Sequence, residues 1–225
     1  MAERRILAVD VGGSHVKLLV SGDEGEPRRF ESGPGLTAQE MVAGVTALTG
    51  DWTYDVVSVG VPSPVHAGRI AADPVNLGPE WVGFDFEKAF GRPTKLVNDA
   101  AMQALGSYEG GKMLFLGLGT GLGSALVVDG TVEPMELGHL PFRMKTFEDY
   151  VGDLGRKRLG KKKWQKAVAE TVERLTAALE PDYVVLGGGN AKRLDEVPAN
   201  ARLGANDNSF VGAFRLWGQD SRARG

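Results

Sequence analysis

Two glycine-rich segments of the chain combine residue types that can bind phosphate. In "AVDVGGSHVK" these residues are Gly12, Gly13 and Ser14, and in "LGLGTGLGSALVVDG" they are Gly119, Thr120, Gly121 and Gly123. A P-loop has a helix behind its glycines, whereas both segments here continue as apolar strands. We therefore expect two β-hairpins whose turn amides and hydroxyls point at phosphate oxygens, although a purely structural hairpin is the alternative for the first turn taken alone.

Asp10 ends the apolar run before the first glycine pair. A carboxylate at the end of a buried strand, beside a phosphate site, suits Mg²⁺ or its water shell, and an isolated buried Asp is costly. We predict Asp10 as the magnesium ligand. Lys17 falls within the second strand and is not assigned the role of a P-loop lysine, and His15 is interpreted as a surface turn residue.

A phosphoryl acceptor needs a base, and "VNDAAMQALG" offers one. Asn98 and Asp99 end one expected strand and begin a helix, which is the usual place for ligands in open α/β sheets. Asp99 is therefore predicted to accept the proton of the acceptor hydroxyl, with helix capping as its alternative role.

Glu136 and His139 stand three residues apart in "EPMELGHLPF", a stretch with Gly and Pro that does not favour a regular helix. Such a pair is compatible with a metal site, but no third or fourth ligand is evident, so hydrogen bonding to a polyol is preferred. Glu148, in "KTFEDYVGDLG", occupies an expected helix start, where an acidic residue is ordinary.

Composition narrows the class of partner. The chain has 225 residues, a net charge of −3 and a pI near 5.7, so no global field favours nucleic acid or an anionic membrane. No apolar run is long enough to span a bilayer and no signal peptide is evident, which predicts a cytoplasmic protein. Zero cysteines exclude disulfides and thiolate metal sites, and three scattered histidines disfavour structural zinc.

The order of expected elements repeats along the chain. The first half reads as a three-stranded meander followed by helices that alternate with strands, and the second half begins again with a meander. The expected strands are 5–11, 16–21, 28–31, 55–62 and 94–99 with three more in 113–134 and one in 182–187, and the expected helices are 37–49, 100–110, 162–179 and 208–217, with a further helix start after 189. Two similar α/β halves follow. We place the first domain at 1–110, with the C-terminal helix 207–220 as a candidate to join it, and the second domain at 111–206.

Taken together, these segments resemble the ROK family of sugar kinases, within the superfamily of sugar kinases, Hsp70 and actin, and especially its polyphosphate/ATP glucokinases. The matching segments are "AVDVGGSHVK", "VNDAAMQALG", "LGLGTGLGSALVVDG", "ELGH" and "YVVLGGG". The resemblance implies two actin-like (ribonuclease H-like) α/β domains with a cleft between them, and a homodimer. It also implies transfer of a terminal phosphoryl group to the 6-hydroxyl of glucose or a related hexose, with Mg²⁺.

The resemblance also assigns residues. Asp99 would be the base, and the sugar would be bound by Asn98, Asp99, Glu136, His139 and Glu148, while Gly187, Gly188 and Gly189 would form the nucleotide-side turn. Many family members carry a Cys-rich zinc motif after the "GH" histidine; this chain has no cysteine, so we expect no zinc.

The sequence is compatible with either polyphosphate or ATP as the phosphoryl donor. The stretch "GRKRLGKKKW" concentrates basic residues from Arg156 to Lys163, which a polyphosphate chain would need, although a solvated helix start explains them equally well. In contrast, "LGGGNAKRL" can place a helix N-terminus at a nucleotide.

Two other functions compete with a kinase. A non-catalytic sugar-binding sensor is the main alternative, because some family members are repressors. Those repressors carry a helix-turn-helix ahead of the first hairpin, which here begins at residue 5, so we expect no DNA-binding module. An actin- or chaperone-like ATPase is disfavoured by the small size and by the sugar signature.

Overall fold

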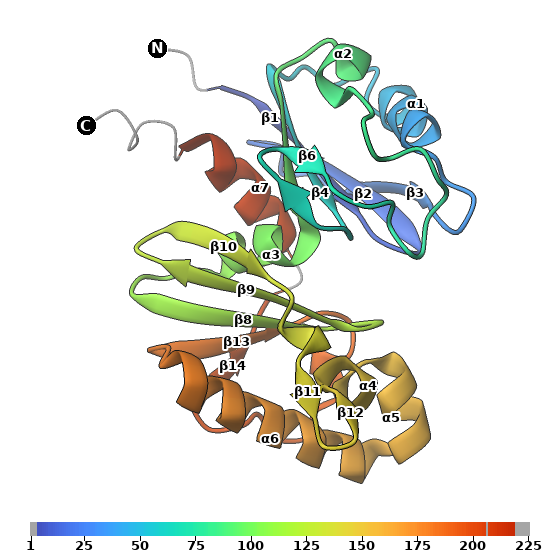
Figure 1. Cartoon of the computed structure of the whole chain (residues 1–225). Coiled ribbons are helices and arrows are strands. Elements are labelled where there is room, and N and C mark those ends of the chain that lie inside the picture. The colour runs from blue at the N-terminus through green and yellow to red at the C-terminus, as the bar shows by residue number, and fades with distance from the viewer. Residues whose placement is uncertain (1–3, 206, 219–225) are drawn as a thin grey trace. The chain divides into compact units, whose positions relative to one another are not determined.

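The structure is a computed structural model that describes residues 4–205 and 207–218, and the chain divides into two compact units (Figure 1). Unit 1 spans Met1–Met102 and Ser209–Gly225, and unit 2 spans Gln103–Asn208. The domain boundaries placed at 110 and 206 stay predictions. Residues 219 and 220, at the end of the expected C-terminal helix, lie outside the described residues, as do 1–3 and 206.

Unit 1 is built on a five-stranded sheet with the strand order β3-β2-β1-β4-β7. Its strands are β1 Ile6–Val11, β2 His15–Val20, β3 Arg28–Glu31, β4 Val56–Val61 and β7 Thr94–Asn98. The first three form an antiparallel meander, whereas β4 and β7 run parallel to β1. The carboxyl ends of β1, β4 and β7 therefore meet at one edge of the sheet, as in other open α/β sheets.

Helices cover both faces of this sheet. Alternate residues of β1, such as Leu7 and Val9, face a core that also contains Met41 of α1 (Ala38–Leu48) and Phe86 of α2 (Phe86–Phe90). The opposite face is met by α7 (Asn208–Gly218), because the Ser58 hydroxyl donates to the Ala213 carbonyl at 2.7 Å. The first turn of α3 (Asp99–Ser107) packs on the same face, against Gly60.

Unit 2 repeats this topology with the strand order β10-β9-β8-β13-β14. Its strands are β8 Lys112–Leu118, β9 Leu122–Val128, β10 Thr131–Met135, β13 Tyr183–Gly187 and β14 Ala201–Leu203. Again the first three strands are an antiparallel meander, and β13 and β14 run parallel to β8. The expected fold class and the two similar halves are confirmed.

Three helices close one face of the unit 2 sheet. They are α4 Phe147–Val151, α5 Asp153–Leu159 and α6 Lys161–Leu179, and Figure 1 shows α6 running along the sheet. The apolar stripe of α6 is buried against the leucines of β8, as its helical spacing predicts. Trp164 of α6 is fully buried, and its ring N–H donates to the Val151 carbonyl at 2.7 Å, which joins α6 to the end of α4.

The helix expected after Gly189 is absent, and this prediction was wrong. The chain instead makes a single 3₁₀ turn, η2 (Ala191–Arg193). In a continuing helix the Asp195 N–H would donate to the Ala191 carbonyl. Instead, the Asp195 N–H donates to Gln165 Oε1 at 3.2 Å, and the Ala191 carbonyl accepts from the Leu194 N–H. A contact with α6 therefore ends the turn.

Several short elements were not predicted from the sequence. They are the ribbons β5 Val65–His66 with β6 Arg69–Ile70 and β11 Pro141–Phe142 with β12 Lys145–Thr146, the 3₁₀ turn η1 Leu137–His139, α2, α5 and β14. Each is too short to show a period. Across 4–205 and 207–218, no helix has the length and apolar character needed to cross a bilayer.

We expect Trp164→Phe to lower the free energy of unfolding by about 1–3 kcal/mol, because the buried Val151 carbonyl loses its donor and the smaller ring leaves a void. Denaturant unfolding followed by circular dichroism measures the loss. Trp52→Phe is the matched control, since Trp52 is half-buried and its ring N–H bonds to no described residue. Equal losses in the two variants would contradict the role given to Trp164.

Candidate functional site

The turn between β8 and β9 has its carbonyl groups bonded and two of its amide groups unengaged. The Asp153 N–H donates to the Gly119 carbonyl at 3.0 Å and to the Thr120 carbonyl at 3.1 Å. Among the described residues, no acceptor is bonded by the backbone N–H of Thr120 or Gly121. Unengaged amides in a glycine turn are suited to an anion, so this turn has the hydrogen-bonding character expected of a phosphate site.

Asn190, which the sequence analysis missed, holds the same turn. Its side-chain Nδ2 donates to the Gly119 carbonyl at 3.2 Å, and its backbone N–H donates to the Leu118 carbonyl at 2.9 Å. Gly188, shortly before it, has a packing reason of its own: a Cβ there, at φ +78°, would lie 2.5 Å from the Leu118 carbonyl oxygen. Gly188 therefore lets the end of β13 lie against the end of β8, whatever the three glycines contribute to a nucleotide.

Glu136, His139 and Glu148 come together beside this turn in unit 2. His139 Nδ1 lies 3.9 Å from Glu136 Oε2, and His139 Nε2 lies 3.6 Å from Glu148 Oε1. Both separations exceed hydrogen-bonding distance, and all three side chains are at least partly exposed. The imidazole and the two carboxylates consequently keep hydrogen-bonding capacity for a polyhydroxyl ligand.

Local structure holds each member of this cluster in place. The Ser124 hydroxyl of β9 donates to the Met135 carbonyl at 2.7 Å and accepts from the Leu137 N–H at 3.1 Å. These bonds hold η1 on the sheet, with Glu136 directly before it and His139 as its last residue. Glu148 lies in the first turn of α4, which begins with a capping box made by Thr146 and Asp149. The expected helix start at Glu148 is confirmed.

Close backbone approach places the cluster against the turn. A Cβ on Gly121 would lie 2.5 Å from Glu148 Oε2, and a Cβ on Gly152 would lie 2.5 Å from the Thr120 carbonyl oxygen. At Gly152 the near atom belongs to the backbone, so only glycine leaves this room, whereas at Gly121 it is the movable end of Glu148. The predicted residues of unit 2 therefore form one group.

The first glycine turn, in unit 1, repeats the pattern of the second. Ser32, also missed in the sequence, donates from its hydroxyl to the Gly12 carbonyl at 2.5 Å, and its N–H donates to the Ser14 carbonyl at 3.0 Å. Within the described residues, the backbone N–H groups of Gly13 and Ser14 bond to no acceptor. His15 is exposed, as predicted, but it is the first residue of β2 and pairs with Glu31 of β3, so its placement in the turn was wrong.

Asp10 stands at the end of β1, half-buried and opposite Lys17 of β2. Burial raises the pKa of the Asp10 carboxyl, while the Lys17 charge and a hydrogen bond from Ser209 of α7 act in the other direction. Cross-strand partners point to the same face of a sheet, so the exposed Lys17 ammonium shares that face with Asp10. The carboxylate is desolvated and has one nearby positive charge.

Asn98 and Asp99 lie at the carboxyl end of β7, two strands from Asp10. Asn98 Oδ1 accepts from the N–H groups of Ala100 and Ala101 at 3.0 and 3.2 Å, so Asn98 caps α3, and its Nδ2 donates to the Ser63 carbonyl at 3.2 Å. Asp99 Oδ1 accepts from Ala100 N–H at 2.8 Å. Most of the hydrogen-bonding capacity of the Asn98 side chain is thus used within the fold. The capping role considered for Asp99 is performed mainly by Asn98.

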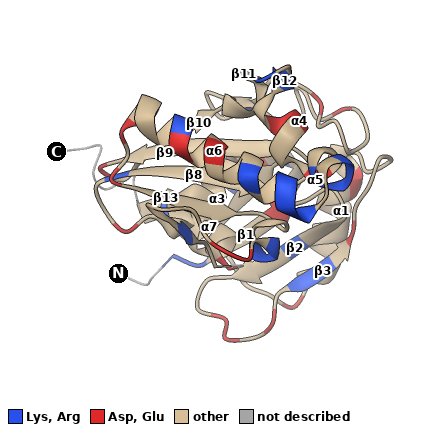
Figure 2. Cartoon of the chain, turned by 90° about the horizontal axis from the view of Figure 1, so that it is seen from below, with Lys and Arg blue, Asp and Glu red and all other residues tan. Residues whose placement is uncertain are grey.

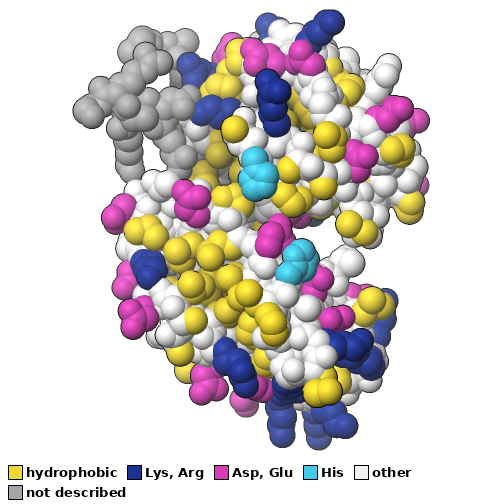
Figure 3. All heavy atoms as spheres, viewed as in Figure 1, with side chains coloured by type: hydrophobic (Ala, Val, Ile, Leu, Met, Phe, Trp, Pro, Cys, Tyr) yellow, Lys and Arg dark blue, Asp and Glu magenta, His cyan; other side chains and the backbone are white. Residues whose placement is uncertain are grey.

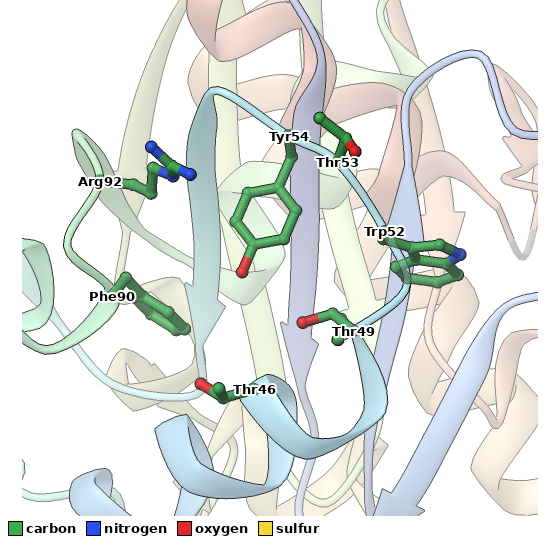
Figure 4. Close-up of a pocket in the computed structure, with 8 residues that line it drawn as sticks. Thr46, Thr49, Trp52, Thr53, Tyr54, Phe90 and Arg92 are labelled. Atoms are coloured by element: carbon green, nitrogen blue, oxygen red, sulfur yellow. The ribbon is translucent and has the colours of Figure 1, made fainter.

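A surface pocket of unit 1 has none of the predicted site residues in its lining (Figure 4). Tyr54 precedes β4 and Arg92 precedes β7, so this pocket is at the amino ends of those strands, whereas Asn98 ends β7. Among the residues the structure describes, no group of three or more His, Cys, Asp or Glu side chains could hold a metal ion.

Comparison with known proteins identifies the family. The model of the ROK family matches residues 6–150. Polyphosphate glucokinase from Mycobacterium tuberculosis (strain CDC 1551 / Oshkosh) is 25% identical over 217 residues, which covers 86% of this chain and 81% of the relative.

Two solved structures are similar in fold. Inorganic polyphosphate/ATP-glucomannokinase from Arthrobacter sp. strain KM superposes with a TM-score of 0.83 at 22% identity, covering 97% of this chain and all, 100%, of that one. A ROK family glucokinase from Streptomyces griseus, in complex with glucose and AMPPNP, gives a TM-score of 0.73 at 16% identity, covering 94% and 98%. The match of the family model over more than half of the sequence confirms the resemblance found in its motifs: the chain belongs to the ROK family.

Proposed function

We propose that this chain is a hexokinase-type sugar kinase, which moves a terminal phosphoryl group from polyphosphate or ATP to the 6-hydroxyl of glucose or a related hexose. One observation carries the proposal: a glycine turn with unengaged amides lies directly against the cluster of Glu136, His139 and Glu148. An anion-binding turn beside groups suited to hydroxyls is what phosphorylation of a sugar requires. Membership of the ROK family and similarity to polyphosphate glucokinase support the same activity.

In this proposal Asp99 accepts the proton of the sugar hydroxyl. The hydroxyl oxygen then forms a bond to the terminal phosphorus, and the bond from that phosphorus to the bridging oxygen of the donor breaks. The turn amides of both hairpins stabilise the phosphate charge, so most of the acceleration comes from positioning and electrostatics. Asn98, Glu136, His139 and Glu148 orient the sugar.

Asp10 fits a magnesium ligand. Mg²⁺ is typically held by one or two carboxylates together with water and substrate phosphates, and Asp10 is a half-buried carboxylate next to the first glycine turn. When bound, the ion would neutralise phosphate charge. We keep a cytoplasmic location, a homodimer and the lack of zinc as predictions.

A coupled assay that crosses glucose, mannose, fructose and N-acetylglucosamine with ATP and polyphosphate tests the activity. We expect a hexose 6-phosphate from at least one pair. Sugar binding without transfer from either donor would instead indicate a sensor.

Asp99→Asn should lower kcat by roughly 10²–10⁴-fold with little change in KM for the sugar, because the amide cannot take up the proton. The fold should be retained, since an amide oxygen can still accept from Ala100 N–H. Steady-state kinetics measures kcat and KM, and thermal melting measures whether the fold is retained. Asp85→Asn, at the start of α2, is the matched control, and an Asp99→Asn variant that keeps a large fraction of its activity would rule out the base.

Gly121→Ala should raise KM for the sugar roughly tenfold, because the new methyl displaces the Glu148 carboxylate. Stability should change little, since Glu148 can move its flexible end. Gly35→Ala is the control, as a Cβ there meets no atom within 4 Å. An unchanged KM for every sugar that the wild type phosphorylates would remove Glu148 from the sugar site.

Asp10→Asn should raise the Mg²⁺ concentration needed for half-maximal rate by roughly tenfold or more, because the amide is a weaker ligand than the carboxylate. Unfolding stability should not fall, since the substitution removes a desolvated charge. Magnesium titrations of the initial rate, with buffered free metal, measure the shift. An identical magnesium dependence in wild type and variant would place the ion elsewhere.

A further inference from the structure

Unit 2 carries a concentration of exposed cations that the proposed chemistry does not use. We call it the basic surface. Its members lie on α5, on the first turns of α6 and on η2, and they are Lys157, Arg158, Lys161, Lys162, Lys163, Lys166, Lys192 and Arg193. Figure 2 shows Lys and Arg gathered over α5 and the start of α6, and Figure 3 shows the same gathering at the lower right of its view.

Few acidic groups neutralise the basic surface. Asp153 lies 2.6 Å from Lys157 Nζ and also bonds Arg156, and Asp195 lies 2.5 Å from Lys161 Nζ. Six members form no ion pair with any described residue: Arg158, Lys162, Lys163, Lys166, Lys192 and Arg193. Even with the exposed Glu196 nearby in sequence, a clear excess of positive charge faces solvent.

Both segments that carry these cations are bonded to the turn between β8 and β9. Asp153, the first residue of α5, donates from its N–H to the Gly119 and Thr120 carbonyls. Asn190, directly before η2, donates to the Gly119 and Leu118 carbonyls. Asp195 links the two segments, because it bonds Lys161 of α6. The basic surface therefore begins at the turn and extends away from it.

The reach of this surface favours a long anion. Helix α5 alone rises about 10 Å from the turn, and Lys162 and Lys163 follow beyond its end. A nucleoside triphosphate has only three phosphates before its nucleoside, so it offers no phosphate group for these lysines to bind. Lysine is a flexible point charge, and it suits a repeating phosphate chain that has no fixed planar geometry to match.

We propose that the basic surface binds the part of an inorganic polyphosphate chain that extends beyond the turn Gly119–Gly121. The inference rests on the proposed kinase function and adds the donor class to it. The terminal phosphate occupies the turn and the following units lie along α5 and the start of α6, so successive transfers draw on a chain that stays bound.

The test is the double variant Lys162→Gln with Lys163→Gln, assayed with long-chain polyphosphate, tripolyphosphate and ATP. Gln and Lys have similar helix propensity, so α6 should persist, which thermal melting checks. We expect KM for long-chain polyphosphate to rise roughly tenfold at low salt, and the slope of log KM against log salt to fall by roughly 1 for each lysine removed. The kcat with long chains, and KM for tripolyphosphate, ATP and sugar, should stay within about twofold.

The matched control is Arg29→Gln with Lys88→Gln, which removes two exposed cations of unit 1 that pair with no described acidic residue. It should leave the KM for long chains unchanged. The inference would be overturned if the KM for long chains rose as much in the control as in the Lys162→Gln with Lys163→Gln variant. It would also be overturned if that variant lost activity equally with short and long donors.

Two further outcomes separate the donor from the activity. Transfer from ATP with none from polyphosphate would overturn the inference and leave the kinase function standing, whereas transfer from no donor would overturn both. An RNA homopolymer can be added as a competing polyanion, with its concentration and the KM for polyphosphate both counted as phosphate groups. If the RNA inhibits transfer from long-chain polyphosphate at a concentration below that KM, the surface binds polyanions in general, and the inference is overturned.

Discussion

The turn between β8 and β9 depends on backbone hydrogen bonds from segments far away in sequence, and the rest of the candidate site in unit 2 depends on the turn. Asp153 at the start of α5 and Asn190 before η2 hold the Leu118, Gly119 and Thr120 carbonyls. These bonds need backbone to approach backbone, which Gly152 and Gly188 permit because they lack a Cβ. With the carbonyls bonded, the amides of the turn are left for an anion.

Unit 1 achieves the same result with a different partner. There Ser32, at the end of β3, holds the Gly12 and Ser14 carbonyls, and the amides of Gly13 and Ser14 are unengaged. The two units share a sheet topology, but their turns have different surroundings. The first has the desolvated carboxylate of Asp10 beside it, and the second has the cluster of Glu136, His139 and Glu148 and the start of the basic surface.

Most of the elements were predictable because their patterns are local. The β-branched runs of β1, β4 and β13, the glycine turns and the apolar stripe of α6 each show their period within one segment. The short strand β14 and the turn η2 have no such period. Their form depends on pairing with β13 and on the contact between Asp195 and Gln165, which connect residues distant in sequence.

For this protein the sequence by itself determined the residue types of the site: the two glycine turns, Asp10, Asp99, and the Glu and His residues of the cluster, each recognisable from its chemistry and its immediate neighbours. The tertiary structure decided how those residues are held. Asn190 binds a carbonyl 71 residues away, and Asn98 spends its side chain on capping α3 and on Ser63. Such roles are settled by which backbone groups fold into reach, because a hydrogen bond needs its two atoms within about 3 Å and the spacing of residues along a chain does not specify that distance.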